Sequence, residues 1–501
     1  MFTASLLSAA LLVSAFCPAM RVDRENRPGY ACYHADIAVS TGLNPIVYCA
    51  FEDDSVPFTI VSSDIAFQRS NDLGQTWLAE NVVISRGNPF ACYPDLKVGP
   101  GGTLFLVFTD RIDGSRGHIA FTRSLDSGRT WSAPVQIDDN ASRVPVGWAR
   151  LALDSSGNLF CTWTDQRGQY LRVYSDVSTD RGQTWGTDVR VDDDTVSFNC
   201  YPPDCFVQPG TNYYLVTAVA PVRGPSGIVL HSLFYKSTDM GRTFSPGFQL
   251  DTFHGYSQQP HVVADSDHVV TDCGGNGYGN QCVTIARTWF ARGDTWGRQV
   301  MVTELDTIYS SFTNGAKLAI APQNTVHTGL MIADRQTTIW NIYYTQSPDA
   351  GLNWSEREPV SSLPLVQQWD PSIATDASGN AYLAWQDMRD TKAEIWFATS
   401  AGTGLAEERL MPETRCLTLK AMPSVCRRYA TLHLSAPPSL LTARFTVSLF
   451  DLSGRLLVHS PLDTRTSSFP LDLGPMPAGV YLVRVTAGTE TAETRVLRLH
   501  D

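Results

Sequence analysis

Apolar and polar residues alternate along most of this chain in short runs, and turn-forming residues separate one run from the next. Clear examples are residues 104–110, 159–165 and 381–387, and a glycine turn precedes each of them. Alternation with a period of two residues predicts β-strands, and the intervening glycines predict tight turns. Between residues 30 and 413 the pattern divides into seven units of four strands each, which predicts an all-β fold.

One short motif, S-x-D-x-G-x-T-W, recurs along the chain at nearly constant intervals. Its aspartate stands at positions 72, 126, 180, 239 and 349, so the intervals are 54, 54, 59 and 110 residues. The last interval is two steps of 55, which predicts a further copy near position 294, and Asp294 stands there in a degenerate form of the motif. A fixed period of this length indicates a repeat architecture, in which each unit buries its apolar face against its neighbours.

The motif has a local physical meaning. Its aspartate can accept hydrogen bonds from backbone N–H groups of the turn, and the glycine two positions later can adopt a positive φ. The threonine then starts the returning strand, and the aromatic residue fills apolar space between adjacent sheets. The motif aspartates are therefore expected to be structural rather than to contact a ligand: Asp72, Asp126, Asp180, Asp239, Asp294 and Asp349.

This motif resembles the Asp box of sialidases and related propellers. The resemblance implies that residues 25–413 form a β-propeller of Asp-box blades, and the seven units predict seven blades. Six blades are the alternative, because sialidase propellers have six. In addition, the Asp-box position of the seventh unit has decayed to Ser-Ala-Gly-Thr-Gly at 400–404.

Both ends of the chain differ from the repeats. Residues 1–19 contain an apolar run that is too short to span a bilayer and that ends in small residues, which is typical of a secretory signal peptide. Cleavage is expected after Ala15 or Ala19. Residues 415–501 predict a small β-sandwich.

Two motifs in this sandwich, the D-x-x-G-R turn at 451–455 and the G-x-Y strand that begins at 479, resemble the C-terminal sorting domain of type IX secretion substrates. This resemblance implies contact with that secretion machinery. It also implies that the protein is secreted or lies on the outer surface of a Gram-negative-type cell, and no transmembrane segment is expected in the mature chain.

Composition adds three constraints. Hydrophobic residues make up 43% of the chain, which is typical of a globular protein, and the formal net charge of −12 argues against nucleic acid as a partner. Ten cysteines follow Cys17, and an even number in an exported chain suggests disulfides. Three pairs are close enough in sequence to close single loops: Cys200 with Cys205, Cys273 with Cys282, and Cys416 with Cys426.

Metal binding has weak support in the sequence. The acidic runs at 138–139 and 192–194 offer the oxygen ligands that Ca²⁺ prefers, but solvated turns are the commoner role of such runs. The cysteines lack the C-x-x-C spacing of a zinc site. We therefore expect no metal site and no cofactor, with Ca²⁺ as the alternative at these runs.

Blade topology indicates where a ligand site would lie. The end of the second strand and the start of the first strand face one mouth of the channel, and the Asp-box turn faces the other. An active site occurs once in a ring, so residues repeated in every blade are expected to be scaffold. The Asp-Arg pairs that end several second strands can therefore either brace the blades or bind a ligand. The inner-strand residues expected at the same mouth are Tyr93, Trp148, Arg150, Tyr201, Asp204, His261, Lys317, Trp369 and Asp370.

The resemblance to sialidases implies a specific set of roles. Those enzymes bind the sugar carboxylate with three arginines and use a tyrosine nucleophile, a glutamate partner and an aspartate acid/base. Asp53 or Asp54 is the candidate acid/base, Tyr93 or Tyr201 the candidate nucleophile, and Glu304 its candidate partner. The arginine candidates are Arg111, Arg167, Arg287, Arg335 and Arg389.

The chain also departs from the sialidase pattern. The F-R-I-P stretch expected before the first blade has no counterpart there, and the similar Arg-Val-Pro at 143–145 stands two blades late. Three functions follow as alternatives. The first is exo-α-sialidase activity on glycans, and the second is a non-catalytic surface module that binds glycan or protein. The third is hydrolysis of a neutral polysaccharide, which requires two acidic groups at the mouth and no arginine cluster.

Overall fold

The structure of the protein is a computed structural model, in which the chain divides into two compact units, residues 14–403 and 404–501. Each unit is described on its own. The structure describes residues 16–24, 31–42, 44–54, 63–85, 90–111, 117–140, 146–193, 199–224, 227–252, 257–278, 281–290, 295–302, 309–312, 318–334, 339–361, 366–390, 392–401, 418–422, 425–426, 429–435, 445–451, 455–462, 468–473, 475–487 and 490–499.

The first unit contains seven antiparallel sheets, each built on four strands, and in the first six sheets these strands follow one another in sequence order. Blade one holds β2 (Ala31–Val39), β3 (Val47–Asp54), β4 (Ser63–Ser70) and β5 (Val82–Val83). Blade two holds β6 (Phe90–Val98), β7 (Leu104–Arg111), β8 (Gly117–Ser124) and β9 (Val135–Gln136). Blade three holds β10 (Val146–Leu153), β11 (Leu159–Asp165), β12 (Arg172–Ser178) and β13 (Val189–Arg190). Blade four holds β14 (Tyr201–Val207), β15 (Tyr214–Gly224), β16 (Gly227–Ser237) and β17 (Phe248–Gln249).

Blades five and six each carry one additional short strand. Blade five holds β18 (Ser257–Ala264), β19 (His268–Tyr278), β20 (Gln281–Phe290) and β21 (Thr295–Trp296), with β22 (Val300–Met301) beside β20. Blade six holds β23 (Tyr309–Phe312), β25 (Val326–Asp334), β26 (Trp340–Ser347) and β27 (Glu358–Pro359), with β24 (Leu318–Ile320) beside β25. Two 3₁₀ turns, Pro100–Gly102 and Pro322–Asn324, precede second strands.

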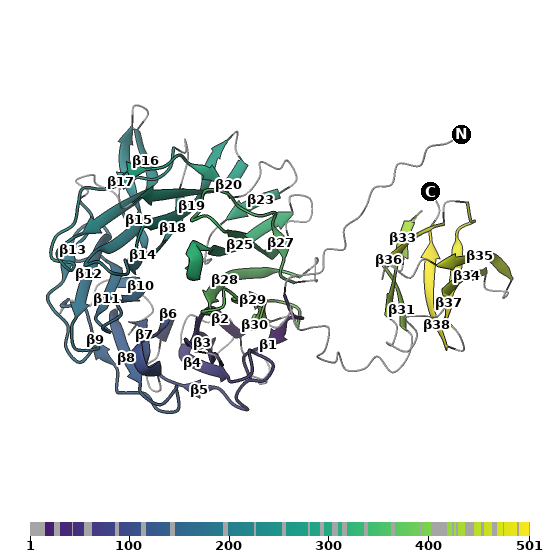
Figure 1. The fold of residues 1–501 in the computed structure, drawn as a ribbon, viewed down its shortest axis with the longest axis horizontal. Coiled ribbons are helices and arrows are strands. Elements are labelled where there is room, and N and C mark those ends of the chain that lie inside the picture. Colours follow the sequence, from purple (N-terminus) through teal and green to yellow (C-terminus); the bar gives the residue numbers. More distant parts are fainter. Residues whose placement is uncertain are drawn as a thin grey trace. The chain divides into compact units, whose positions relative to one another are not determined.

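The last blade is completed by the other end of the propeller chain. Blade seven holds β28 (Gln368–Thr375), β29 (Ala381–Asp387) and β30 (Glu394–Thr399), and its outer strand is β1 (Met20–Arg21), which pairs antiparallel with β30. Figure 1 shows the resulting ring of blades, with β1 beside β30. The prediction of seven blades is confirmed, and the six-blade alternative is wrong. The seventh unit lacks an Asp box because its outer strand arrives from the N-terminal side.

The Asp boxes have the predicted geometry, with the serine as a further participant. In blade two, Ser124 Oγ donates to Asp126 Oδ1 at 2.8 Å and accepts the N–H of Gly128 at 2.8 Å. Thr130 donates to the same carboxylate through its backbone N at 2.9 Å and through its hydroxyl at 2.6 Å. The same hydrogen bonds to the carboxylate recur at Asp72, Asp180 and Asp239. At Asp349, the backbone and side-chain N–H groups of Asn353 take the place of the threonine. Asp294 lies outside the described residues.

Each box glycine also fixes the distance between neighbouring blades. A Cβ atom added to Gly128 would lie 2.2 Å from the ring of Phe67 in blade one, and one on Gly182 would lie 2.1 Å from Phe121 in blade two. At Gly74, the corresponding distance to Phe397 of blade seven is 2.0 Å. The aromatic rings therefore pack directly on the backbone of the next blade, including across the closure of the ring.

Around the channel, inner-strand side chains form hydrogen bonds between several pairs of neighbouring blades. Asp36 of blade one accepts the N–H of Leu96 in blade two at 2.6 Å, and Asp95 of blade two accepts that of Leu151 in blade three at 2.6 Å. Asp204 accepts the N–H of Val262 at 3.0 Å. Ile37 N donates to Ser372 Oγ at 3.3 Å, which extends the series from blade seven to blade one.

The second unit contains two small sheets that share an apolar core. One sheet has the order β31 (Thr418–Met422), β33 (Tyr429–Ser435) and β36 (Ser468–Asp472). The other has the order β32 (Val425–Cys426), β38 (Glu490–Arg498), β37 (Gly479–Ala487), β34 (Phe445–Asp451) and β35 (Leu456–Leu462). Leu432 of the first sheet and Phe445, Tyr481 and Val483 of the second are buried in one cluster, which agrees with the predicted sandwich.

The disulfide prediction is wrong for the cysteines whose side chains are described. Cys200 and Cys205 are both buried and are not joined. Cys200 directly precedes β14, and the Sγ atom of Cys205 lies 3.8 Å from the carbonyl oxygen of Phe160. Cys273 is a buried thiol in β19, where it pairs with Ile285 rather than with Cys282. The side chains of Cys416 and Cys426 lie outside the described residues. The described residues include no helix long and apolar enough to cross a membrane.

Candidate functional site

The inner strands of blades one, two, three and seven each carry a β-bulge near one mouth of the channel. One residue of each bulge has a positive φ: His34 (45°), Tyr93 (55°), Trp148 (54°) and Asp370 (48°). Bulky side chains rarely adopt this left-handed conformation, which costs about 1–3 kcal/mol and persists only where the surrounding structure imposes it. The bulges therefore hold four different side chains at equivalent positions of four blades.

His34 lies at the centre of this group. Its Nδ1 is 2.9 Å from Glu52 Oε1, and its Nε2 is 3.7 Å from Asp370 Oδ2. Glu52 Oε1 also accepts the backbone N–H of Tyr93 at 2.6 Å, and Gln386 Nε2 donates to Asp370 Oδ2 at 2.6 Å. These contacts join blades seven, one and two. We refer to His34, Glu52, Tyr93, Asp370 and Gln386 as the mouth cluster.

The charge of His34 follows from these neighbours. Burial alone would lower the pKa of this imidazole, but the carboxylates of Glu52 and Asp370 raise the pKa of His34 to about 9, against an opposing contribution from Arg150. His34 is therefore an imidazolium at neutral pH. Burial raises the pKa of Asp370, and the positive charge of His34 acts in the opposite direction.

Asp54 adds a second acidic group at the end of β3. Because side chains alternate along a strand, Glu52 and Asp54 project from one face of the sheet and Asp53 from the other. Burial and the negative charges of Glu52 and Asp53 raise the pKa of Asp54 to about 7. Burial also raises the pKa of Tyr33, which pairs with Glu52 across the strands. Asp54, whose carboxyl group keeps its proton up to a pH of about 7, therefore lies beside Glu52, whose carboxylate is paired with the His34 imidazolium.

Aromatic rings extend the mouth cluster toward blade three. The rings of His34 and Tyr93 have their centroids 4.6 Å apart, and those of Tyr93 and Trp148 are 5.8 Å apart. Arg150 follows on the same strand, where its Nη1 donates to the carbonyl of Ala149 at 3.2 Å. Such a row of rings offers a flat, partly apolar surface of the kind that lines small-molecule sites. Of the nine residues expected at this mouth, Tyr93, Trp148 and Asp370 are linked through His34 by these contacts, and the charge of Arg150 acts on His34.

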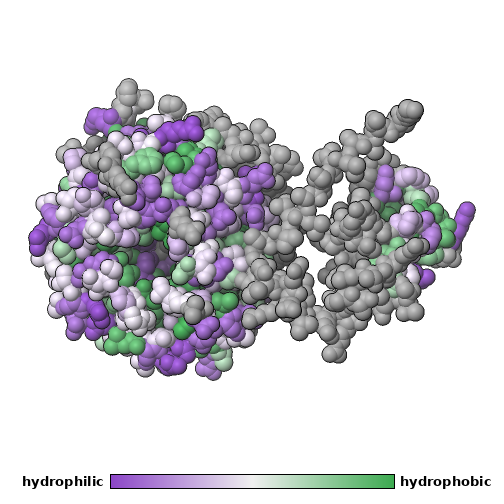
Figure 2. Space-filling view, viewed as in Figure 1, coloured by the Kyte–Doolittle hydropathy of each residue, from purple (hydrophilic) through white to green (hydrophobic). Residues whose placement is uncertain are grey.

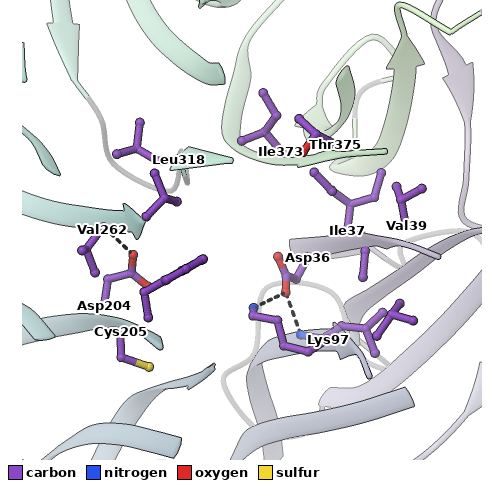
Figure 3. Close-up of a pocket in the computed structure, with 16 residues that line it drawn as sticks. Asp36, Ile37, Val39, Lys97, Asp204, Cys205, Val262, Leu318, Ile373 and Thr375 are labelled. Atoms are coloured by element: carbon purple, nitrogen blue, oxygen red, sulfur yellow. Dashed lines mark hydrogen bonds and ion pairs between the residues drawn. The ribbon is translucent and has the colours of Figure 1, made fainter. Parts of the chain in front are cut away.

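A cavity among the inner strands has both charged and apolar side chains in its lining. This cavity of about 210 Å³ is lined by Asp36, Lys97 and Asp204 together with aliphatic side chains of five blades. Figure 3 shows the Asp36 carboxylate facing Lys97 and the backbone of β6, the strand that carries Lys97. Asp204 lies on the other side of the cavity. Lys97 Nζ lies 2.9 Å from Asp95 and 4.0 Å from Asp36, and these carboxylates raise its pKa although burial acts to lower it. In Figure 2, apolar residues gather around the centre of the ring, and hydrophilic residues are frequent at its rim.

The other predicted catalytic residues lie in different surroundings. Asp53 is buried and its Oδ2 accepts the side-chain N–H of Asn81 at 3.3 Å, so it faces away from the mouth cluster. Asp165, its equivalent in blade three, accepts the side chain of Asn140 in the same way at 3.1 Å. Tyr201 begins β14, half-buried, in the register position that Tyr33 has in blade one. Glu304 lies outside the described residues.

The described arginine candidates do not converge on a common point. Arg167 pairs with Asp165 at 2.6 Å and with Asp188 of its own blade. Arg389 pairs with Asp387 at 2.6 Å and lies 3.3 Å above the ring of Trp396. The Asp-Arg pairs thus brace single blades rather than joining neighbours.

Arg287 is held at the outer part of blade five. It donates to the carbonyl of Gly297 at 3.0 Å and lies 4.9 Å from the ring centre of Phe248. The side chain of Arg111 and all of Arg335 lie outside the described residues, as does Lys317.

Two members of the mouth cluster were missed by the sequence analysis, although the repeat contains a signal for them. Glu52 occupies the strand position that is Thr109 in blade two, Thr164 in blade three and Gln386 in blade seven. A comparison of second strands would have marked this glutamate as the residue that breaks the pattern. The comparison of inner strands would likewise have marked His34, whose position holds Tyr93, Trp148 and Asp370 in blades two, three and seven.

The acidic runs considered for Ca²⁺ serve the scaffold. Asp138 accepts the N–H of Ile119 at 2.8 Å, and Asp192 accepts that of Val173 at 2.8 Å. An aspartate that follows the outer strand therefore anchors the third strand of its blade. Equivalent bonds join Asp251 to Ser232 and Asp23 to Ile395. Among the residues that the structure describes, no group of three or more side chains that could hold a metal ion is found.

Comparison with known families identifies the C-terminal unit. Residues 429–497 match the family described as the secretion system C-terminal sorting domain. This segment is a sorting domain of that family. The sorting domain spans β33 to β38 and confirms the predicted location, secreted or on the outer surface of a Gram-negative-type cell. No match was found among curated protein sequences.

The part of the chain that precedes the sorting domain is similar in fold to several solved propellers. One is a protein of unknown function from Dyadobacter fermentans, with 12% identity, coverage of 77% of this chain and 98% of that one, and a TM-score of 0.49. Another is an α-L-arabinanase of Penicillium chrysogenum in complex with arabinobiose, with 16% identity, coverage of 77% and 98%, and a TM-score of 0.45. A third is the NanB sialidase of Streptococcus pneumoniae, with 9% identity, coverage of 76% and 94%, and a TM-score of 0.44.

Proposed function

We propose that this protein is an exported glycoside hydrolase that cleaves its substrate at the mouth cluster, with Asp54 as general acid and Glu52 as the second carboxylate. One observation carries the proposal: Glu52 and Asp54 project side by side from β3, and Glu52 stands where the equivalent strands of blades two, three and seven have threonine or glutamine. Most glycoside hydrolases act through such a pair of carboxyl groups.

The two carboxyl groups have the environments that their roles require. A general acid must carry a proton near the working pH, and burial with neighbouring negative charge gives Asp54 a pKa of about 7. Glu52 is held by the His34 imidazolium and by the N–H of Tyr93, which fix the direction of its carboxylate. In the proposed reaction Asp54 gives its proton to the glycosidic oxygen as the bond to the anomeric carbon breaks. Glu52 then either attacks that carbon or takes a proton from the attacking water.

The surroundings favour a neutral glycan over a sialoside. Recognition of a sugar carboxylate requires guanidinium groups that are available to pair with it. Among the arginine candidates whose side chains the structure describes, Arg167 and Arg389 are each occupied by aspartates of their own blades, and Arg287 is held among aromatic rings and backbone carbonyls. The rings of Tyr93 and Trp148 instead offer a stacking surface for the flat face of a sugar. Of the three alternatives, this arrangement best fits hydrolysis of a neutral polysaccharide.

The test is a screen of the purified full-length protein against neutral polysaccharides, neutral aryl glycosides and a fluorogenic sialoside. We expect turnover of a neutral substrate, with Glu52→Gln and Asp54→Asn each lowering kcat by about 10²–10⁴-fold. Asp53→Asn is the matched control, because this carboxyl lies between the other two on the opposite face of the strand. It should lower the melting temperature but leave kcat within about threefold of the wild type.

Other outcomes of the screen separate the alternatives. Turnover of the sialoside that is lost in Arg335→Ala would favour the sialidase hypothesis. Binding of a glycan without turnover of any substrate, unchanged in Glu52→Gln and Asp54→Asn, would favour a non-catalytic surface module.

A further inference from the structure

The first described residues of the chain are built into blade seven. The side chain of Phe16 is 5% exposed, and its ring packs edge-on against that of Tyr344 with centroids 5.0 Å apart. It belongs to the same apolar cluster as Trp385, a fully buried residue of the second strand of this blade. Cys17 N donates to the carbonyl of Thr399 at 2.9 Å. Phe16 and Cys17 therefore contribute to the core and to the hydrogen bonding of the blade.

The contacts continue along β30. Met20 pairs with Phe397, and Val22 N donates to the carbonyl of Ile395 at 2.8 Å. Arg21 forms an ion pair with Glu394 at 2.8 Å. The segment from 16 to 23 thus follows β30 from its end to its beginning, as the strand that closes the ring.

The sequence that precedes this strand has the features of a secretory leader, and the sorting domain shows that the chain is exported. Two positions have the small residues that a leader peptidase requires, Val-Ser-Ala at 13–15 and Cys-Pro-Ala at 17–19. Cleavage after Ala15 keeps the whole closing strand. Cleavage after Ala19 removes Phe16 from its pocket and leaves an apolar cavity beside Trp385.

We propose that export removes residues 1–15 and that Phe16 is the first residue of the mature protein, where it completes blade seven. The alternative of a lipid anchor at Cys17 does not suit the structure. Its Sγ accepts the N–H of Thr399 at 3.4 Å, within the blade, and the bulky Phe16 precedes it. The fold therefore favours cleavage after Ala15, since only this cleavage keeps both β1 and the contacts that Phe16 and Cys17 make in the blade.

The first test is to determine the N-terminus of the exported protein. The full chain with its leader is produced in a Gram-negative host, and the protein recovered from outside the cytoplasm is analysed by N-terminal sequencing and by intact mass. An N-terminus at Phe16 is expected. An N-terminus at Met20 or later, a retained leader, or a lipid on Cys17 would overturn the proposal.

The second test measures what the closing strand contributes. Chains that comprise residues 16–501 and 20–501 are produced without a leader, and their thermal unfolding is compared. The longer chain should melt at least about 3 °C higher, and Phe16→Ala in the longer chain should remove most of the difference. Equal melting of all three proteins would overturn the structural reason for cleavage at Ala15, whatever the activity of the mouth cluster.

Discussion

A methyl group at one Asp-box glycine should disrupt the contact between blades two and three. Gly182 has a φ of 79°, and a Cβ atom there would lie 2.1 Å from the ring of Phe121. That ring cannot easily move, because it stacks on Phe105 on one side and meets Trp185 edge-on on the other. Gly182→Ala therefore imposes both backbone strain and a steric clash.

A second glycine separates these two effects. Gly379 has nearly the same φ, 82°, but nothing lies within 4 Å of the position of its Cβ. Left-handed backbone costs an alanine about 1 kcal/mol, and overpacking of a buried contact costs a further 1–3 kcal/mol, roughly. We therefore expect Gly379→Ala to lower the free energy of unfolding by about 1 kcal/mol and Gly182→Ala by about 3 kcal/mol.

The assay is equilibrium unfolding of the full-length variants in urea, followed by tryptophan fluorescence. Phe121→Leu in the Gly182→Ala background removes the ring that clashes, so the double variant should lose at least about 1 kcal/mol less than the sum of the single variants. If Gly182→Ala and Gly379→Ala are destabilised equally, or if the double variant shows no coupling, the contact between ring and backbone does not set the spacing of the blades.

Four further predictions concern charge. Turnover should fall as the pH rises through about 7, because Asp54 then loses the proton that it donates, and Asp54→Asn should show no such alkaline limb in any residual activity. His34 has a pKa of about 9 in the folded state, so its contribution to stability is fully present below its ordinary pKa and is lost as the pH rises through 9. The difference in melting temperature between wild type and His34→Gln should therefore shrink as the pH rises from the ordinary pKa of histidine through 9. Burial acts to raise the pKa of Asp180, but its hydrogen bonds together lower the pKa to about 2. The contribution of Asp180 to stability is therefore present above its ordinary pKa of about 4 and is lost as the pH falls toward 2. The destabilisation caused by Asp180→Asn should therefore disappear in acid. Arg389→Met should lower the melting temperature without changing KM for a neutral substrate, and a raised KM would contradict the bracing role of this arginine.

The architecture was predictable because its signals are local. An Asp box contains its own donors and acceptors within eight residues, so the motif and its period were enough to indicate seven blades and to assign Asp126 and its equivalents to the scaffold. The sorting domain was predictable for the same reason.

The mouth cluster was only partly predictable, because it depends on the closure of the ring. His34 and Asp370 come from the first and last blades, and no local pattern links them before blade seven is known to adjoin blade one. The arginines were candidates for binding a ligand because the resemblance to sialidases implies three of them, whereas their recurrence beside aspartates favoured a role in the scaffold. In the described cases that spacing of two residues lets each arginine pair with the aspartate of its own strand. The disulfide prediction was wrong for the described cysteines because two cysteines that are close in sequence need not lie on facing strands.

The bulges of the inner strands place the residues that face the mouth and the carboxylates that bind the next blade at different positions of the strand. The residue with positive φ contributes its side chain to the mouth, and the inner-strand carboxylates that accept a backbone N–H of the next blade, such as Asp36 and Asp95, lie two residues later. A substitution at His34, Tyr93, Trp148 or Asp370 can thus change what the mouth recognises while leaving those inter-blade hydrogen bonds in place. Under the proposed function, changes at these few equivalent positions, each contributed by a different blade, should alter glycan preference, and a library of variants at these positions would test this.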